Sequence, residues 1–264
     1  MTKTRNLSDL LDANGDVKLG NLDNVPASND ASALTTGTLP IARIADGDIT
    51  TAKLSDSSVS LAKLTATGTK DATTFLRGDN TFAVVSSDFV KLASGSFSSN
   101  SLSFDGYFTS AYSHYKIIIT DAIPSGNNNG IEMRYRISDS DVTTSDYNNV
   151  GQHGAINLGT GASDGTSHAE GDSKFILQQG YAVSNASGLC LNAELTIFNP
   201  LSTSLYKHYH YKSSCHYSSA TGYWVTSTGG GYYDANTTAL SGFTILNSAG
   251  NITSGNVYLY GIKA

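Results

Sequence analysis

The hydrophobic and polar positions follow one pattern before about residue 67 and another after about residue 90. In the first part, three units repeat every ten residues, at 39–44, 49–54 and 59–64. Each unit has an aliphatic residue, two spacers, an alanine, a cation and a second aliphatic residue. A repeat at a fixed spacing is typical of pieces that stack or wrap on one another.

One copy of this repeat cannot bury its own aliphatic side chains, because each unit offers too few of them to offset the entropy of ordering the chain. We therefore expect self-association around an axis. Extended segments should alternate with short helical turns near 52–54 and 61–64, capped by Asp48 or Ser58. The residues expected to form the shaft are Leu39, Ile41, Ile44, Ile49, Leu54, Val59, Leu61 and Leu64.

After residue 90, apolar and polar residues alternate over short runs, which predicts half-buried strands. Tyr115–Ile119 is the exception, since its sequence suggests burial on both faces. Clusters of Gly, Asn and Ser at 125–130, 159–165, 229–231 and 247–251 should be the turns between strands. About ten strands of this kind indicate a jelly-roll-like β-sandwich. The expected strands are 115–119, 131–137, 174–178, 193–197, 206–211, 223–226, 243–246 and 256–261.

The distribution of aromatic residues separates the parts of the chain. Only Phe75, Phe82 and Phe89 precede residue 91, and every Tyr and the single Trp follow it. Because aromatic side chains supply much of a core's burial, only the second part can form a core as a single chain. We expect an N-terminal docking segment at 1–36, a repeat shaft at 37–67, a hairpin or collar at 68–90 and a β-sandwich head at 91–264.

Charge and cysteine content exclude some classes of protein. The formal net charge of -6 argues against nucleic acid or an anionic membrane as a partner. No apolar run is long enough for a membrane helix, and the polar start does not resemble a secretion signal. Cys190 and Cys215 show no spacing of a disulfide framework or zinc site, so buried thiols are the favoured interpretation.

Several motifs of the chain resemble tail-fibre proteins of tailed bacteriophages. They are Gly20–Val25, Gly37–Pro40, the Asp48–Leu54 unit and above all Thr74–Phe82. The closing segment Gly250–Lys263 resembles the terminal strand of fibre heads from aquatic phages.

The resemblance spans most of the chain and implies a homotrimer. Its N-terminus would dock on a phage tail or capsid protein, and its C-terminal head would face the host. The expected location is the virion, after assembly in the cytoplasm of the host bacterium. The fold class expected overall is mainly β, with an extended repeat-containing shaft followed by the sandwich head. A short tail fibre, or a fibre on the capsid or neck, suits the chain length equally well.

Aromatic residues beside the glycine run 229–231 are the candidates for receptor binding. Sugar rings stack on exposed aromatic planes, and neighbouring Asn or Asp side chains can bond their hydroxyls. The same side chains could instead fill the core or a subunit interface, where Tyr and Trp are enriched. The candidates are Tyr223, Trp224, Tyr232 and Tyr233.

His208 and His210 are two residues apart and would point to the same face of a strand. In a trimer they would bring six imidazoles to the axis, enough for an octahedral metal ion, a site known in some phage fibres. Surface or packed histidines are the simpler interpretation, and Tyr206, Tyr209 and Tyr211 suggest an aromatic sheet face around them. No other cofactor is expected.

The sequence contains no motif of a known catalytic class, such as a nucleophile elbow, a phosphate-binding loop or a metalloprotease helix. Glu132 and Glu194 should be the solvent-side residues of their strands, and as a glycosidase pair they are a weak candidate. We therefore expect a non-enzymatic adhesin that binds a host-surface glycan or protein. The alternatives are a capsid, neck or tail decoration fibre with a bracing role, and a depolymerase.

Overall fold

The computed structural model describes residues 13–14, 44–45, 47–85, 87–157, 161–217 and 223–263. The chain divides into two compact units, Met1–Val84 and Val85–Ala264, which are described one at a time. The predicted docking segment 1–36 lies outside the described residues apart from positions 13 and 14. The predicted shaft residues Leu39 and Ile41 also lie outside them.

The repeat units in the first unit form short 3-10 turns joined by extended residues, as the sequence predicts. These turns are η4 (Thr51–Lys53) and η5 (Leu61–Lys63). Both repeats make the same contact, in which a lysine ammonium donates to the carbonyl five residues earlier. Lys53 Nζ lies 2.6 Å from Asp48 O, and Lys63 Nζ lies 2.9 Å from Ser58 O.

The prediction that Asp48 caps the first turn is wrong. Thr50 occupies the N-cap position of η4, and no side chain bonds the turn there. The Asp48 carboxylate instead accepts the backbone N–H of Ala45 at 2.8 Å, within the connector that precedes the turn. The connector therefore has a hydrogen-bonded structure of its own, separate from the helical turn.

The aliphatic side chains of the repeat are exposed in the single chain. Ile49 is 55 % exposed and Val59 is 54 % exposed, and Ile44 and Leu54 are exposed as well. Leu64 is half-buried, and the side chain of Leu61 is outside what the structure describes. This stretch therefore has the unburied apolar surface that the sequence predicts.

A two-stranded antiparallel hairpin follows the repeats. It joins β1 (Thr74–Leu76) to β2 (Phe82–Val84), and an isolated bridge pairs Thr67 with Thr81. Gly68 has φ +85°, and a side chain there would lie 2.2 Å from the carbonyl oxygen of Phe82. Only glycine suits this position, because both the backbone angle and the space exclude a Cβ atom.

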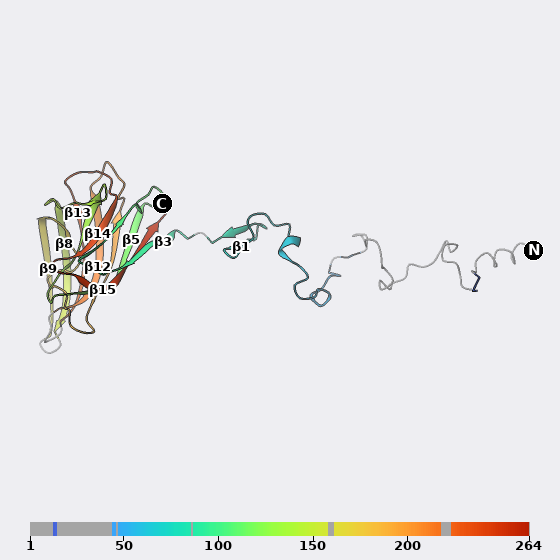
Figure 1. Ribbon diagram of the computed structural model, residues 1–264, viewed down its shortest axis with the longest axis horizontal. Helices are drawn as coiled ribbons and strands as arrows, with labels where there is room; N and C mark the ends of the chain where they lie inside the picture. Colours follow the sequence, from blue (N-terminus) through green and yellow to red (C-terminus); the bar gives the residue numbers. More distant parts are fainter. Residues whose placement is uncertain are drawn as a thin grey trace, which may run out of the picture. The chain divides into compact units, whose positions relative to one another are not determined.

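The second unit is a β-sandwich, which confirms the mainly β prediction; its paired strands all run antiparallel (Figure 1). The smaller sheet has the order β10-β6-β14-β4, with β7 pairing β6. Its strands are β4 (Ser101–Asp105), β6 (Ile131–Ile137), β7 (Ser140–Asp141), β10 (Phe175–Ile176) and β14 (Gly242–Asn247).

The larger sheet has eight strands in the order β3-β15-β5-β11-β12-β13-β8-β9. Long strands of up to 12 residues make this sheet the broad layer of the sandwich. Its strands are β3 (Phe89–Ser96), β5 (His114–Pro124), β8 (Tyr147–Asn157), β9 (Gly161–Asp172), β11 (Leu191–Phe198), β12 (Lys207–Tyr217), β13 (Tyr223–Tyr233) and β15 (Ile252–Ile262).

Aromatic rings hold the two sheets together. The ring of Phe175 in β10 lies 4.1 Å from that of Tyr209 in β12, centroid to centroid. Tyr135 in β6 meets Tyr233 in β13 edge-on at 6.3 Å. Each buried aromatic residue contributes a large apolar area, so a few such contacts dominate the core.

Lys207 is fully buried at the start of β12, and no carboxylate of the described residues is bonded to it. Its ammonium donates to three backbone carbonyls, those of Ser202 (2.5 Å), Leu205 (3.1 Å) and Thr237 (3.0 Å). Burial lowers the pKa of this lysine. The contacts fasten two loops to the strand, since the carbonyls come from both sides of it in sequence.

Two predicted turns are in fact parts of strands. Residues 161–165 begin β9, and residues 229–231 lie in the middle of β13. The Tyr115–Ile119 stretch alternates buried and half-buried residues in β5, so the prediction of burial on both faces is also wrong. Strands β3, β4 and β8 were not predicted.

The two cysteines are free thiols, as favoured from the sequence. Cys215 is buried, and burial raises the pKa of its thiol to about 12. Cys190 is only partly buried, and burial raises its pKa as well. Thiols with raised pKa values are poor nucleophiles at neutral pH, so neither is suited to reactive chemistry.

Candidate functional site

The candidate site lies on the solvent side of the eight-stranded sheet, which we call the outer face. Residues alternate along β12, where Tyr209 and Tyr211 point into the core and His208 and His210 point outward. This period of two is the ordinary consequence of strand geometry. Tyr209 and Tyr211 therefore do not form the aromatic sheet face around the histidines that the sequence suggested.

Three consecutive glycines in β13 shape this face. A Cβ atom at Gly229 would lie 2.8 Å from the Tyr211 ring, and one at Gly231 would lie 3.0 Å from the Tyr209 ring. A Cβ atom at Gly230 would point outward, 2.8 Å from the imidazole of His210. The first and last glycines make room for core tyrosines and for the backbone of β8, and the middle one is buried under the imidazole of His210.

This part of β13 is the floor of a hollow of about 800 Å³ on the outer face. A second hollow of about 480 Å³ shares Gln152, Lys212 and Thr228 with the first. A third, of about 550 Å³, shares Gly154 and Thr226 with the second. We call these three contiguous hollows the groove.

The groove follows β13, with Tyr232 at one end and Trp224 at the other. They are eight positions apart, so the groove is roughly 26 Å long at the usual rise of a strand. Trp224 is 55 % exposed and Tyr232 is 40 % exposed. A long groove with an aromatic ring at each end suits an extended ligand that has flat apolar faces.

Polar groups line the Tyr232 end of the groove. Lys116 Nζ in β5 lies 2.7 Å from Glu194 Oε2 in β11, and Lys212 stands opposite Glu194 in the register of the sheet. His208 faces the ring of Tyr232 at 5.9 Å, and His210 meets the ring of Phe198 edge-on at 5.2 Å. These side chains offer both donors and acceptors around the floor that β13 forms.

The Trp224 end is more apolar. The indole N–H donates to Ser214 Oγ at 2.9 Å, and the ring stacks on His216 at 5.7 Å between centroids. The hydrogen bond and the stacking both hold the indole against the sheet. Ile156 is exposed beside it, and Asp164 on β9 lines the same hollow.

The other two aromatic candidates lie elsewhere. Tyr233 is 2 % exposed and packs in the core against Tyr147. Tyr223 is half-buried and clusters with Tyr181 and Tyr217. Successive residues of β13 point to opposite faces of the sheet. Of the four candidates, only Trp224 and Tyr232 therefore border the groove.

His208 and His210 are exposed neighbours on the outer face, each already in contact with an aromatic ring. Among the described residues of the single chain, no group of three or more His, Cys, Asp or Glu side chains is placed to hold a metal ion. The six-imidazole site requires three chains, and it stays a prediction.

Glu132 corrects one sequence expectation, because it is buried although it alternates with the core residues of β6. Its carboxylate lies 3.9 Å from Lys174 Nζ, and burial raises its pKa to about 7 despite the lysine. Glu194, by contrast, is exposed. Glu132 is in the smaller sheet and Glu194 is in the larger one. Each points away from the other sheet, so the two are not a catalytic pair.

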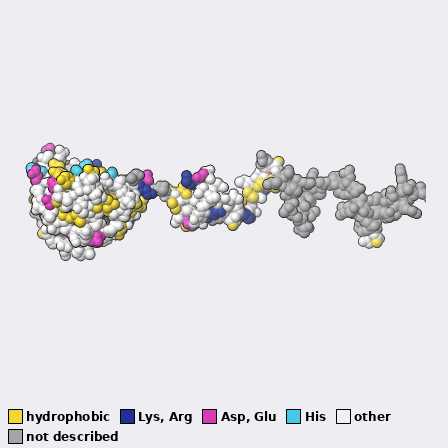
Figure 2. All heavy atoms as spheres, turned by 90° about the horizontal axis from the view of Figure 1, so that it is seen from above, with side chains coloured by type: hydrophobic (Ala, Val, Ile, Leu, Met, Phe, Trp, Pro, Cys, Tyr) yellow, Lys and Arg dark blue, Asp and Glu magenta, His cyan; other side chains and the backbone are white. Residues whose placement is uncertain are grey.

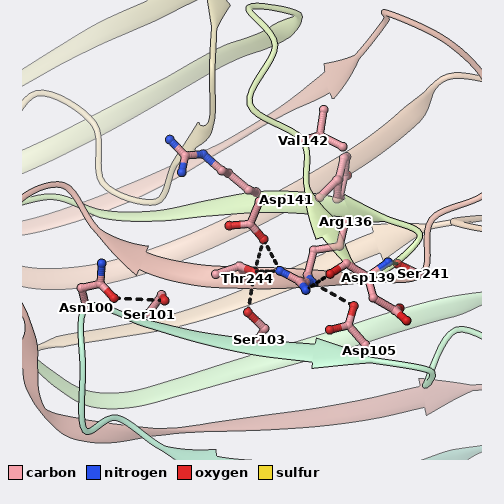
Figure 3. A network of polar contacts seen from close by, with 12 residues as sticks. Asn100, Ser101, Ser103, Asp105, Arg136, Asp139, Asp141, Val142, Ser241 and Thr244 are labelled. Atoms are coloured by element: carbon pink, nitrogen blue, oxygen red, sulfur yellow. Dashed lines mark hydrogen bonds and ion pairs between the residues drawn. The ribbon is translucent and has the colours of Figure 1, made fainter.

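A second polar cluster lies on the smaller sheet (Figure 3). Arg136 donates to Asp105 at 2.8 Å and also to Asp141, and Thr244 donates to Asp141 at 2.6 Å. Ser103 completes the network through Thr244 at 2.8 Å. Arg136, Asp105 and Asp141 each have a charged partner on another strand of the same sheet, which is typical of a structural network rather than a binding site.

The sequence did not identify most of the groove. Lys116, Glu194 and Lys212 come from three strands, and only the sheet order brings them together. The sequence does mark this face by the glycine run 229–231, but the run predicts a turn and not the middle of a strand.

Within the described residues, no helix is long and apolar enough to span a membrane. The chain matches no family model, no curated protein and no solved structure.

Proposed function

We propose that this chain is a virion fibre protein that attaches to the particle by its N-terminus and binds a host-surface glycan with its β-sandwich. The observation that supports glycan binding is the groove along β13. It combines a floor of threonine and glycine residues of β13, exposed aromatic rings at both ends and hydrogen-bonding groups along its sides. Sugars present apolar ring faces and rows of hydroxyl groups, which complement such a surface.

The fibre part of the proposal is supported by the repeat and its exposed aliphatic side chains. In this proposal, three chains wrap the repeat into a shaft, the sandwich is a jelly-roll-like head, and no catalysis is involved. Repetition of a head that binds weakly gives avidity, so each groove needs only a modest affinity. The protein would be part of the virion after assembly in the bacterial cytoplasm.

The test is binding of the labelled full-length protein to permissive cells. We expect saturable binding that purified surface polysaccharide competes. Trp224→Ala combined with Tyr232→Ala should weaken binding by about tenfold or more, because each stacking ring contributes roughly 1 kcal/mol. Tyr107→Ala is the matched control, since Tyr107 is similarly exposed but follows β4 of the other sheet.

Two results would contradict the proposal. Absence of saturable binding to permissive cells would refute a receptor-binding role and favour a decoration fibre that braces the particle. Degradation of the competing polysaccharide by the purified protein would refute a binding role without catalysis.

A further inference from the structure

The charged side chains that line the groove balance one another. Lys116 and Lys212 line the Tyr232 end together with Glu194, and Asp164 lines the Trp224 end. Glu194 lies 2.7 Å from Lys116 and stands opposite Lys212 in the register of the sheet. The lysines and carboxylates of the described lining residues are equal in number, so the groove favours neither a polyanion nor a polycation. An uncharged ligand suits it best.

The hollow at the Trp224 end is built around Gly154 of β8. In the register, Gly154 has Asp164 of β9 on one side and Thr226 of β13 on the other. A Cβ atom at Gly154 would have only Thr226 Oγ1 near it, at 3.9 Å. The backbone is therefore open to a ligand between a carboxylate and a hydroxyl, on strands that lie roughly 10 Å apart.

An apolar wall borders this opening. Ala162, Ile156 and Trp224 stand opposite one another on the same strands, at the next outward-facing position, and all of them are exposed. The indole N–H of Trp224 is already bonded to Ser214 Oγ, so a ligand meets the apolar part of the ring. Figure 2 shows histidine side chains, which mark the outer face, in cyan along one margin of this unit, with apolar side chains in yellow beside them.

We infer that this hollow holds the acetamido group of an N-acetylated amino sugar, and that the glycan bound in the groove is an uncharged one that contains such sugars. The inference rests on the proposed function and specifies its ligand class. The N–H and the carbonyl of an acetamido group point in opposite directions, because its amide is planar and trans. The N–H can donate to Asp164 on one side of Gly154, and the carbonyl can accept from the Thr226 hydroxyl on the other. The methyl group can then lie against Ile156 and the Trp224 ring.

Other substituents of a sugar ring fit this hollow less well. A hydroxyl group reaches only one of the two polar side chains and leaves the apolar wall in contact with water. An amino group is attracted by Asp164, but it places a charge against Ile156 and Trp224, which costs solvation free energy. A carboxylate is repelled by Asp164.

The test compares three oligosaccharides by calorimetry with the full-length protein. They are a chito-oligosaccharide long enough to span the groove, its fully de-N-acetylated form and the cello-oligosaccharide of the same length. All share one linkage and differ only in the group at carbon 2, which is acetamido, amino or hydroxyl. We expect the acetamido form to bind about tenfold more tightly than the hydroxyl form, because it gains a hydrogen bond to a charged group. The amino form should also bind more weakly than the acetamido form.

Variants assign this preference to residues. Asp164→Asn and Thr226→Val, both at exposed positions, should each reduce the preference for the acetamido form about threefold or more. Asp88→Asn is the matched control and should have no effect. Asp88 is also exposed, but it precedes β3, which lies at the opposite edge of the sheet from β9.

Equal or tighter binding of the hydroxyl or the amino form would overturn the inference, as would absence of binding of the acetamido form. A preference that survives in both variants would overturn it too, because the acetamido group would then lie elsewhere. So would a change in the mass of the assembly in these variants, since the hollow would then be an interface between copies. In each of these cases, saturable binding to permissive cells that depends on Trp224 and Tyr232 would leave the proposed glycan-binding function standing.

Discussion

Glu132 lies on the outer side of the smaller sheet, where only 6 % of the residue is exposed. Burial raises its pKa from 4.5 to about 7, an effect that Lys174 only partly offsets. Between these two values the folded protein binds more protons than the unfolded chain. The contribution of Glu132 to the free energy of unfolding therefore falls as the pH rises from about 4.5 to about 7, and then stays level.

Glu132→Gln should remove this loss of stability at higher pH. We expect the variant to be more stable than the wild type by about 1–3 kcal/mol near pH 8, and the difference to vanish near pH 4.5. Urea unfolding across this range measures it. Glu170→Gln, at an exposed glutamate, is the control and should show no such trend. A variant less stable than the wild type near pH 8 would show that the carboxylate is stabilising.

Lys207 is expected to stabilise the fold through its hydrogen bonds to three backbone carbonyls. Replacing it with Met keeps the apolar stem but leaves the carbonyls of Ser202, Leu205 and Thr237 without their donor. Unsatisfied buried polar groups cost about 1–3 kcal/mol each, less if water enters, so we expect a loss of at least about 2 kcal/mol. Chemical denaturation measures the loss, and Lys263→Met at the exposed end of the chain should be neutral. Equal stability of the two variants would contradict this role of Lys207.

At the scale of elements, the glycines of the outer face are not equivalent. A Cβ atom at Gly230 would lie 2.5 Å from the carbonyl oxygen of Tyr209, whereas at Gly154 the nearest neighbour is Thr226 Oγ1 at 3.9 Å. Gly230→Ala should therefore destabilise the sheet by about 1–3 kcal/mol. Gly154→Ala should be neutral, or stabilising by up to about 1 kcal/mol, because it restricts the unfolded chain. Thermal unfolding of the two variants compares them, and the reverse order would contradict the account of the β13 floor.

The same glycines show what the sequence could predict. Alternation identified Ile131–Ile137 and most of β11 and β15, because strands with one buried face have a period of two. It failed at 229–231, since glycine is a turn signal as well as the residue that a close approach requires. Glycine is needed there because the backbone of β8 and the rings of Tyr209 and Tyr211 on β12 come close on both sides, contacts that only the sheet order creates.

Whether two residues of a strand share a face depends on whether they are an even number of positions apart, and this rule also limited the prediction of the site. Trp224 and Tyr232 are an even number of positions apart and share the outer face, whereas Tyr223 and Tyr233 take the opposite parity. The sequence could have separated these pairs had β13 been predicted as one strand. The lysines and glutamate of the groove come from other strands, and no local pattern connects them.

At the scale of the whole molecule, the repeat stretch and the sandwich differ in how they can be stable. The sandwich buries an aromatic core within one chain. The repeats leave Ile49, Leu54 and Val59 exposed, and apolar surface of this kind is stabilised by association. We therefore propose that the repeat stretch associates between chains and that a fibre is the result.

The mass of the purified full-length protein in solution, measured by light scattering, tests this claim most directly. We predict three times the single-chain mass of 27.7 kDa, and we predict that Ile49→Asp with Val59→Asp lowers it to that of one chain while the sandwich stays folded. A folded wild-type protein of single-chain mass would contradict the account.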